Sequence, residues 1–321
     1  MRDIDGTVAL ARTARNKGAR FPNILDERYQ GIAAGKAGFV KPYVAPRFRI
    51  QPGDKIFTIG SCFARETEGY FLEYGCRVPV REFSIPEGEL PLGHEASHLL
   101  NEYTAGAICQ RILAAFGEFS YAYNGGLEMA DGGFRDLLLQ HNAAPVSLER
   151  LMERRAEIDA LYRQLRESDA VVITLGLIES WFERDSGLYL NRTPSLYSVR
   201  KNSDKYGFRV LDYPDSLDLI DQTVSCLVRH GIGKILMTVS PVALLTSFTG
   251  EDVIVANSYS KSVLRCVAEQ MKEKYPEVDY FPSYEIATSF GLAGYKEDNF
   301  HLHPFAIQQI MESMRAAYFE K

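Results

Sequence analysis

Apolar runs that end at a glycine or a serine alternate with amphipathic segments from residue 54 onward, and this alternation constrains the fold most strongly. The longer runs lack the polar alternation of a half-exposed strand, so they are predicted to be strands buried on both faces. They span residues 55–59, 170–175, 234–239 and 278–281, and a shorter strand is predicted at 76–80.

The segments between these strands repeat apolar residues at helical spacing. These helices are predicted at residues 63–74, 96–116, 147–167, 215–230, 257–275 and 304–319, with a glycine-rich loop at 117–146. The pattern predicts a three-layer α/β/α domain with a mainly parallel sheet.

Composition sets the boundaries of this domain and excludes some partners. Residues 1–49 are rich in Arg, Lys, Gly and Pro with weak periodicity, which predicts an N-terminal arm on a domain at residues 50–321. The net charge of −6 is spread along the chain and argues against nucleic acid or an anionic membrane as the main partner. No apolar run approaches the roughly 18 residues of a membrane span. The five scattered cysteines contain no CxxC pair, so we expect free thiols and a cytoplasmic location.

Small and polar residues follow the predicted strands. Residues 60–62 read Gly-Ser-Cys after the first strand, Gly176 follows the next long run, and Ser240 follows the third. In sheets of this class the ligand-binding crevice lies at the carboxyl ends of the strands. The sequence therefore places a candidate site at this edge.

Ser61 and Cys62 put two nucleophile types side by side at a strand-to-helix turn. The free N–H groups of a helix N-terminus lower the pKa of a thiol and can hold a developing oxyanion. The turn therefore fits acyl transfer. It also fits a Ser61 helix N-cap beside a small buried Cys62, and pattern alone leaves both interpretations open.

Asp298 and His301 form an Asp-x-x-His pair just before the last predicted helix. One turn can set the carboxylate against the imidazole, which fixes the tautomer and stabilises the imidazolium. His303 competes for the same role. Asp298, His301 and His303 also suggest a metal-assisted hydrolase as a third option, but no further ligand stands at matching spacing, so no metal is expected.

Other residues near the strand ends are candidates for substrate or oxyanion binding. Gly176 permits close approach of a substrate to the backbone, and Glu179 is expected to be a supporting hydrogen-bond partner. Trp181, the single tryptophan, fits either the lining of an acceptor pocket or a cap on the core. The remaining candidates are Ser240, Asn257, which also fits plain helix capping, and the amide of Asn101.

Several motifs in order resemble the GSCFA family, for which residues 60–64 read Gly-Ser-Cys-Phe-Ala. The others are NEYTAGAICQ, TLGLIESW, TVSPVALL, VANSYSKSVLR and YFPSYEI, so the resemblance runs from about Lys55 to the C-terminus. The family is similar to SGNH hydrolases, whose fold is a three-layer, flavodoxin-like α/β domain. Esterases, lipases and carbohydrate acyltransferases are among these relatives.

The resemblance assigns roles only in part. Asp298 and His301 match the last SGNH motif, Asp-x-x-His. Cys62 aligns with the nucleophilic serine of the first motif, Gly-Asp-Ser, and Ser61 aligns with its aspartate. The resemblance therefore favours Cys62 over Ser61 as the nucleophile. The third motif, Gly-x-Asn-Asp, has Glu179 at its last position here and lacks the asparagine, so Asn101 or backbone N–H groups must compensate.

These observations predict an esterase or O-acyltransferase that acts on a small-molecule or glycan substrate such as a polysaccharide. No cofactor is expected beyond a possible acyl-CoA donor, which the thiol and the cytoplasmic setting favour. The alternative is a non-catalytic binding or assembly protein on an eroded hydrolase fold. The oligomeric state is not determined by the sequence.

Overall fold

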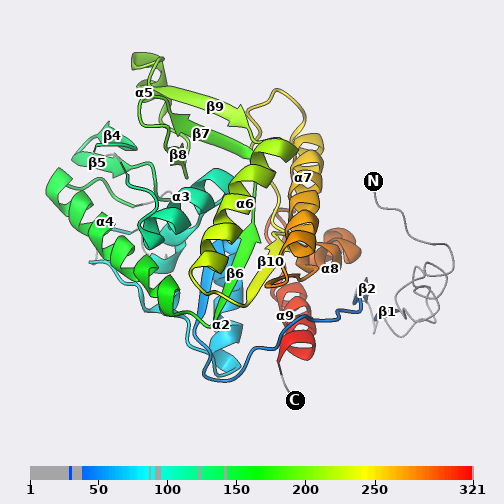
Figure 1. The fold of residues 1–321 in the computed structure, drawn as a ribbon. Helices are drawn as coiled ribbons and strands as arrows, with labels where there is room; N and C mark the ends of the chain where they lie inside the picture. Colours follow the sequence, from blue (N-terminus) through cyan, green and yellow to red (C-terminus); the bar gives the residue numbers. More distant parts are fainter. Residues whose placement is uncertain are drawn as a thin grey trace.

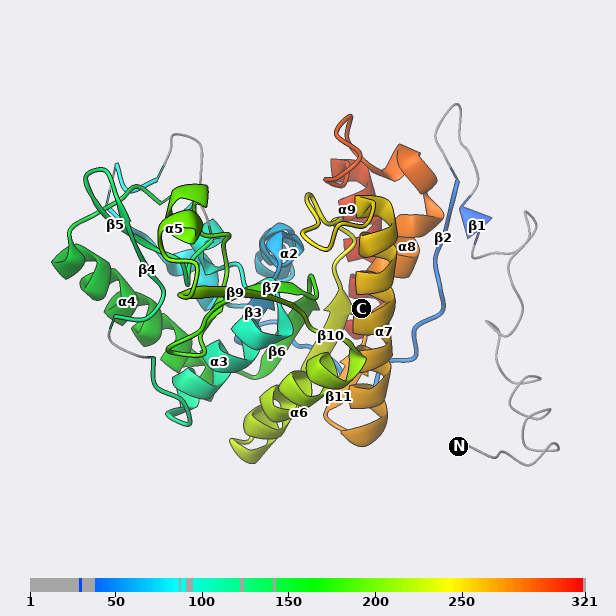
Figure 2. The same cartoon turned by 90° about the horizontal axis from the view of Figure 1, so that it is seen from above.

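The computed structural model describes residues 29–30, 38–86, 88–90, 95–121, 124–140 and 143–319. Most of the predicted N-terminal arm, 1–49, lies outside these residues. Its described residues are 29–30 and 38–49, and the segment 38–49 packs on the C-terminal half of the chain (Figure 2). Val40 N–H donates to Ser289 Oγ at 2.9 Å, and Arg47 Nη1 donates to the backbone carbonyls of Lys272, Tyr275 and Val278. This part of the arm is therefore attached by specific contacts.

A parallel four-stranded sheet forms the centre of the described chain, in the order β11-β10-β6-β3 (Figure 1). Its strands are β3 (Ile56–Gly60), β6 (Ala170–Leu175), β10 (Ile235–Val239) and β11 (Val278–Tyr280). The four long strands expected from the sequence are confirmed, and so is the α/β class. Because all four strands are parallel, their carboxyl ends meet at one edge of the sheet.

Helices cover both faces of the sheet (Figure 2). Phe57 and Met237 face one layer, whereas their neighbours Ile56 and Leu236 face the other, as the twofold side-chain period of a strand requires. The first layer holds α3 (Ala105–Phe116), α4 (Leu148–Tyr162), α6 (Tyr213–Arg229) and α7 (Val253–Lys274). The second holds α2 (Cys62–Glu73), α8 (Ser283–Ser289) and α9 (Pro304–Tyr318). The domain is thus a three-layer α/β/α sandwich.

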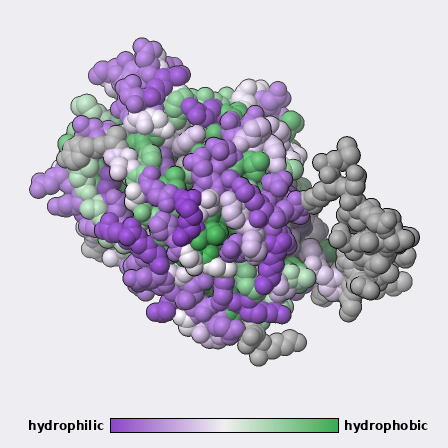
Figure 3. Space-filling model, in the orientation of Figure 1, coloured by the Kyte–Doolittle hydropathy of each residue, from purple (hydrophilic) through white to green (hydrophobic). Residues whose placement is uncertain are grey.

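The face seen in Figure 3 is mostly hydrophilic, with small scattered hydrophobic spots. Among the described residues, every helix is too short or too polar to cross a membrane.

Among the described residues, one small antiparallel sheet pairs β1 (Tyr29–Gln30) with β2 (Phe39–Val40). Two further small antiparallel sheets lie beside the sandwich. One is a hairpin of β4 (Leu127–Ala130) and β5 (Gly133–Asp136), within the segment predicted to be a loop. The other has the order β8-β7-β9, from β7 (Glu179–Glu183), β8 (Tyr189–Leu190) and β9 (Tyr206–Val210), and α5 (Leu196–Lys201) lies between β8 and β9 in the chain.

The prediction of a strand at residues 76–80 is wrong. Arg77 makes one isolated bridge with Lys55, and the chain then enters a 3-10 helix at Pro79–Glu82. Proline has no N–H for a sheet hydrogen bond and favours the first turn of a helix, which ends the pairing.

The prediction of a single helix at residues 96–116 is also wrong. An extended segment divides this region into two helices, and that segment contributes to the site. A 3-10 helix at Ala96–Leu100 is followed by an extended crossing of residues 101–104, and only then by α3. In the crossing, Asn101 forms a bridge with Gly60 at the end of β3. This pairing holds the backbone extended and carries Asn101 over the carboxyl edge of the sheet.

Gly60 makes the closest backbone approach in the sheet. Its φ is +137°, and a Cβ at this position would lie 2.1 Å from the carbonyl oxygen of Thr174 on β6. Any side chain would therefore both clash with β6 and force an unfavourable backbone conformation.

We predict that Gly60→Ala lowers the free energy of unfolding by on the order of 3 kcal/mol or more, because strain and backbone overlap add. Gly53→Ala is the matched control, since Gly53 has φ +93° but nothing within 4 Å of the place that a Cβ would occupy. It should lose only about 1 kcal/mol. Urea unfolding measures both, and equal losses would contradict the proposed overlap.

Candidate active site

A cavity of about 550 Å³ opens at the carboxyl edge of the sheet. Residues after β3, β6 and β10 line it, together with the crossing before α3 and the segment before α9. Of the residues predicted from the sequence, it brings together Ser61, Cys62, Asn101, Gly176, Ser240 and His301. Segments from distant parts of the chain therefore meet at one cavity.

Ser61 is the N-cap of α2, but its hydroxyl does not act as a cap. Among the described residues Ser61 Oγ has no hydrogen-bond partner, although the residue is only 2% exposed. Its N–H donates to Thr174 O at 3.1 Å. The backbone N–H of Ser61 is thus occupied, while the hydroxyl is buried against the cavity without a partner.

Cys62 is the first residue of α2 and is half-buried. Burial raises the pKa of its thiol to about 11, while the Lys261 ammonium and the N–H groups of Cys62 and Phe63 act to lower it. The helix N-terminus and a cation thus favour the thiolate, and burial in a largely apolar cavity opposes it. All five cysteines lie in the described ranges and are free.

His301 and Asp298 form a well-defined pair. His301 Nδ1 and Asp298 Oδ2 are 2.8 Å apart, and Asp298 Oδ1 accepts the N–H groups of Phe300 and His301 at 2.9 Å each. The His301 hydrogen bond and these two N–H groups hold the pKa of Asp298 well below its ordinary value. Because Nδ1 is engaged, Nε2 is the ring nitrogen left for proton transfer.

The pair stands at the cavity without contacting either nucleophile candidate directly. His301 lines the cavity and its side chain is 50% exposed. Among the described residues, neither Ser61 nor Cys62 forms a hydrogen bond with His301. The choice between the two nucleophiles is therefore not decided by this contact.

The floor of the cavity is close-packed backbone around Gly176. A Cβ on Gly176 would lie 2.7 Å from Tyr103 O and 3.2 Å from Ser61 Cβ. Leu177 N–H donates to Tyr103 O at 2.8 Å, so it is not available to a substrate. Asn101 is 2% exposed, and within the described residues its Oδ1 has no partner.

Glu179 and Asn257 support the cavity without lining it. Glu179 accepts the Ser247 hydroxyl and the Phe248 N–H, each at 2.7 Å. Asn257 Oδ1 accepts the Leu244 N–H at 2.9 Å. Both side chains thus fix the loop after β10, which forms one wall.

Trp181 and His303 lie outside the cavity lining. Trp181, on β7, packs against Phe208 and Phe248 at ring distances of 5.5 and 5.4 Å. His303 is the N-cap of α9, and its Nδ1 accepts the Phe305 N–H. These contacts match the packing role for Trp181 and a capping role for His303.

Lys261 lies behind the cavity, not among its lining residues, and its burial was not predicted from the sequence. Helix α7 begins at Val253 with Asp252 as its N-cap, not near Asn257 as predicted, so Lys261 lies in the third turn and is 1% exposed. Its Nζ donates to Gly176 O at 2.8 Å. The available signal was its spacing, since Lys261 shares the apolar face of α7 with Leu264.

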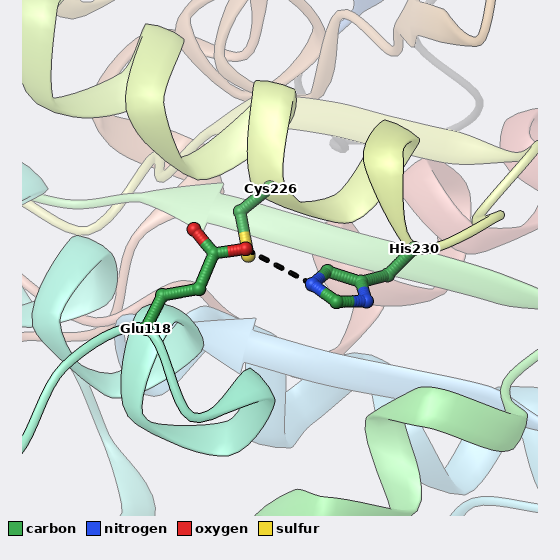
Figure 4. A group of neighbouring side chains, drawn as sticks. All are labelled: Glu118, Cys226 and His230. Atoms are coloured by element: carbon green, nitrogen blue, oxygen red, sulfur yellow. Dashed lines mark hydrogen bonds and ion pairs between the residues drawn. The ribbon is translucent and has the colours of Figure 1, made fainter.

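A second group of reactive side chains lies at the opposite edge of the sheet. Glu118, Cys226 and His230 point toward one another, with one donor atom from each within 4.8 Å (Figure 4). The Glu118 carboxylate already accepts His230 Nε2 at 2.9 Å and the Arg229 guanidinium. Within the described ranges this is the one such group, and the donor atoms of Asp298, His301 and His303 do not lie within that spacing.

Fold and cavity define an α/β protein with a crevice at the strand ends, where proteins of this architecture bind their ligands. The model of the GSCFA family matches residues 55–314. The chain therefore belongs to the GSCFA family. No curated protein matches it significantly in sequence.

Three solved structures are similar to this chain. A family 3 carbohydrate esterase from Clostridium thermocellum is 12% identical, with 82% of this chain and 94% of that chain covered and a TM-score of 0.32. An acetylxylan esterase from Geobacillus stearothermophilus is 13% identical, with 85% and 98% covered and a TM-score of 0.34. An alpha/beta hydrolase enzyme from the metagenome of Lake Arreo, Spain, is 12% identical, with 84% and 96% covered and a TM-score of 0.33. With TM-scores this low, the likeness carries no conclusion about function.

We predict that Lys261→Met stabilises the protein at neutral pH. Burial lowers the pKa of Lys261 from 10.5 to about 7, so folding releases a proton between these two pH values and stability rises with pH there. The penalty is present below about pH 7 and is lost toward pH 10.5. Lys261→Met removes this penalty but also loses the hydrogen bond to Gly176 O. The net effect should raise the free energy of unfolding near pH 7 by about 2–4 kcal/mol.

Urea unfolding as a function of pH measures this gain. Lys274→Met, on the same helix but half exposed and paired with Asp221, is the control and should give no gain. A Lys261→Met gain that is absent, or that does not shrink as the pH rises, would contradict a buried charge at this position.

Proposed function

We propose that the protein is an acyl-transfer enzyme of SGNH type, an esterase or O-acyltransferase acting on a carbohydrate or related metabolite. The observation that carries the proposal is the cavity itself. It joins the Ser61-Cys62 turn, from the first strand of the sheet, to His301 with its partner Asp298, from near the C-terminus. A nucleophile, a base and an orienting carboxylate are the parts that covalent acyl transfer requires.

In the proposed reaction Cys62 is the nucleophile. His301 takes the thiol proton through Nε2 while Asp298 holds the imidazole in the required tautomer. Cys62 Sγ attacks the acyl carbonyl, and His301 then protonates the leaving alcohol. Water or a sugar hydroxyl completes the transfer from the acyl-thioester, and an acyl-CoA would serve as donor in the transferase form.

The proposed oxyanion site combines backbone N–H groups of α2 with the Asn101 amide, whose Nδ2 also donates to the Tyr103 hydroxyl at 3.4 Å. The N–H groups of Cys62 and Phe63 belong to the open first turn of α2, where backbone donors are free. The Ser61 N–H is excluded because it is bonded to Thr174 O. The Asn101 side-chain amide is the further donor, in the place of the missing third-motif asparagine.

The cavity lining favours an apolar acyl group. Much of the wall is aliphatic or aromatic, with Phe63, Leu99, Val242, Phe300 and Ile307 among the lining residues. Half-exposed His301 stands where a hydroxyl acceptor can enter from solvent. A polar acceptor such as a glycan then stays at the mouth while the acyl chain is buried.

The proposal predicts that Cys62→Ala and His301→Ala each lower kcat/KM for ester substrates by at least about 100-fold, because they remove nucleophile and base. Asp298→Ala should lower it less. Turnover of p-nitrophenyl esters and of acyl-CoA, with a sugar acceptor, measures the effect and separates hydrolase from transferase. Full activity in His301→Ala would overturn the assignment.

Matched controls test whether the losses are local. His303→Ala removes an imidazole two residues from His301 but outside the cavity, and Cys266→Ala removes an exposed thiol, so both should keep full activity. Ser61→Ala should keep most activity. A loss of activity in Ser61→Ala without any loss in Cys62→Ala would instead identify Ser61 as the nucleophile.

A non-catalytic binding protein is the second candidate. The third-motif asparagine is missing from this chain, which weakens the case for an oxyanion hole. Burial also raises the pKa of Cys62, and a thiol that stays protonated fits a cavity that only binds. Binding of an acylated sugar by calorimetry, with no turnover by the wild type or any variant, would favour this candidate.

A further inference from the structure

Lys261 is a cation buried directly behind the candidate nucleophile. The residue is 1% exposed. Its ammonium donates to the carbonyl oxygen of Gly176, a residue that lines the cavity. Gly176 in turn packs against Ser61, since a Cβ added to Gly176 would lie 3.2 Å from Ser61 Cβ. The charge therefore lies next to the turn that presents Cys62.

This cation has no compensating carboxylate. Among the described residues Lys261 forms no ion pair, and the Cys62 thiol is the one titratable group that acts on it. A lone buried charge is costly, and such groups are kept where a function uses them. The charged and titratable groups that act on Cys62 or line its cavity are Lys261, Glu66, Tyr103, His98 and His301.

We propose that Lys261 is a positioning residue that supplies the counter-charge of the Cys62 thiolate and so makes Cys62, rather than Ser61, the nucleophile. The pair shares one proton: Cys62 Sγ–H and the neutral Lys261 amine become thiolate and ammonium, with no change in net charge in the buried site. Glu66 opposes the thiolate, and Lys261 offsets it. Lys261 also fixes the Gly176 carbonyl, so the same contact sets both the charge and the shape of the floor. The proposal rests on the acyl-transfer function but is tested without it.

The test is the rate at which iodoacetamide alkylates Cys62 as a function of pH, followed on the Cys62 peptide by mass spectrometry. The full chain carries Cys266→Ala, because Cys266 is exposed and would compete for reagent. Lys261→Met is expected to shift the alkylation profile upward by one pH unit or more, which means at least about tenfold slower labelling near pH 7. Lys261→Arg keeps the charge and should retain faster labelling than Lys261→Met.

The direction of the change separates an electrostatic role from a structural one. A misfolded variant would expose Cys62 and label faster, so slower labelling in Lys261→Met is not explained by unfolding. Wild-type and Lys261→Met proteins with the same profile would overturn the proposal. A Lys261-dependent profile in a protein that turns over no ester would uphold it while refuting the acyl-transfer function.

Discussion

The close contact between the carboxyl ends of β3 and β6 determines the rest of the site. Gly60 and Gly176 lack side chains, so the backbone of β3 lies against Thr174 and the Ser61 turn lies against Gly176. The Ser61 N–H bond to Thr174 O locks this arrangement. As a result, α2 begins at the edge of the cavity, and the N–H groups of its first turn are those to which the proposed reaction assigns the oxyanion.

Much of the fold was predictable because its strands carry strong local signals. Continuous apolar runs between glycines and helices identified all four strands of the central sheet. The failures arose where distant contacts decide the local structure. Residues 101–104 look helical in isolation but pair with the end of β3, and α7 extends four residues further toward the N-terminus than predicted, from an Asp252 cap.

The candidate site was predictable to the extent that it follows strand ends. Ser61, Cys62, Gly176 and Ser240 all come directly after strands and all line the cavity. Trp181 is near Gly176 in the sequence, but β7 carries it into a separate antiparallel sheet. The burial of Lys261 behind the cavity was not predicted, because the burial of a lysine depends on what packs around it, and the apolar spacing of α7 was its one local sign.

The two groups that handle protons in the proposed site have opposite exposure. His301 and Asp298 are about half exposed, at 50% and 47%, whereas Lys261 is shielded from solvent. Dissolved ions screen charges at a surface but act weakly on buried ones, because the Debye length matters only where ions can approach. Added salt should therefore weaken the electrostatic interaction of the exposed His301–Asp298 pair and leave that of the buried Lys261 ammonium almost unchanged. The contributions of the acid–base pair and of the counter-charge can thus be distinguished without a mutation.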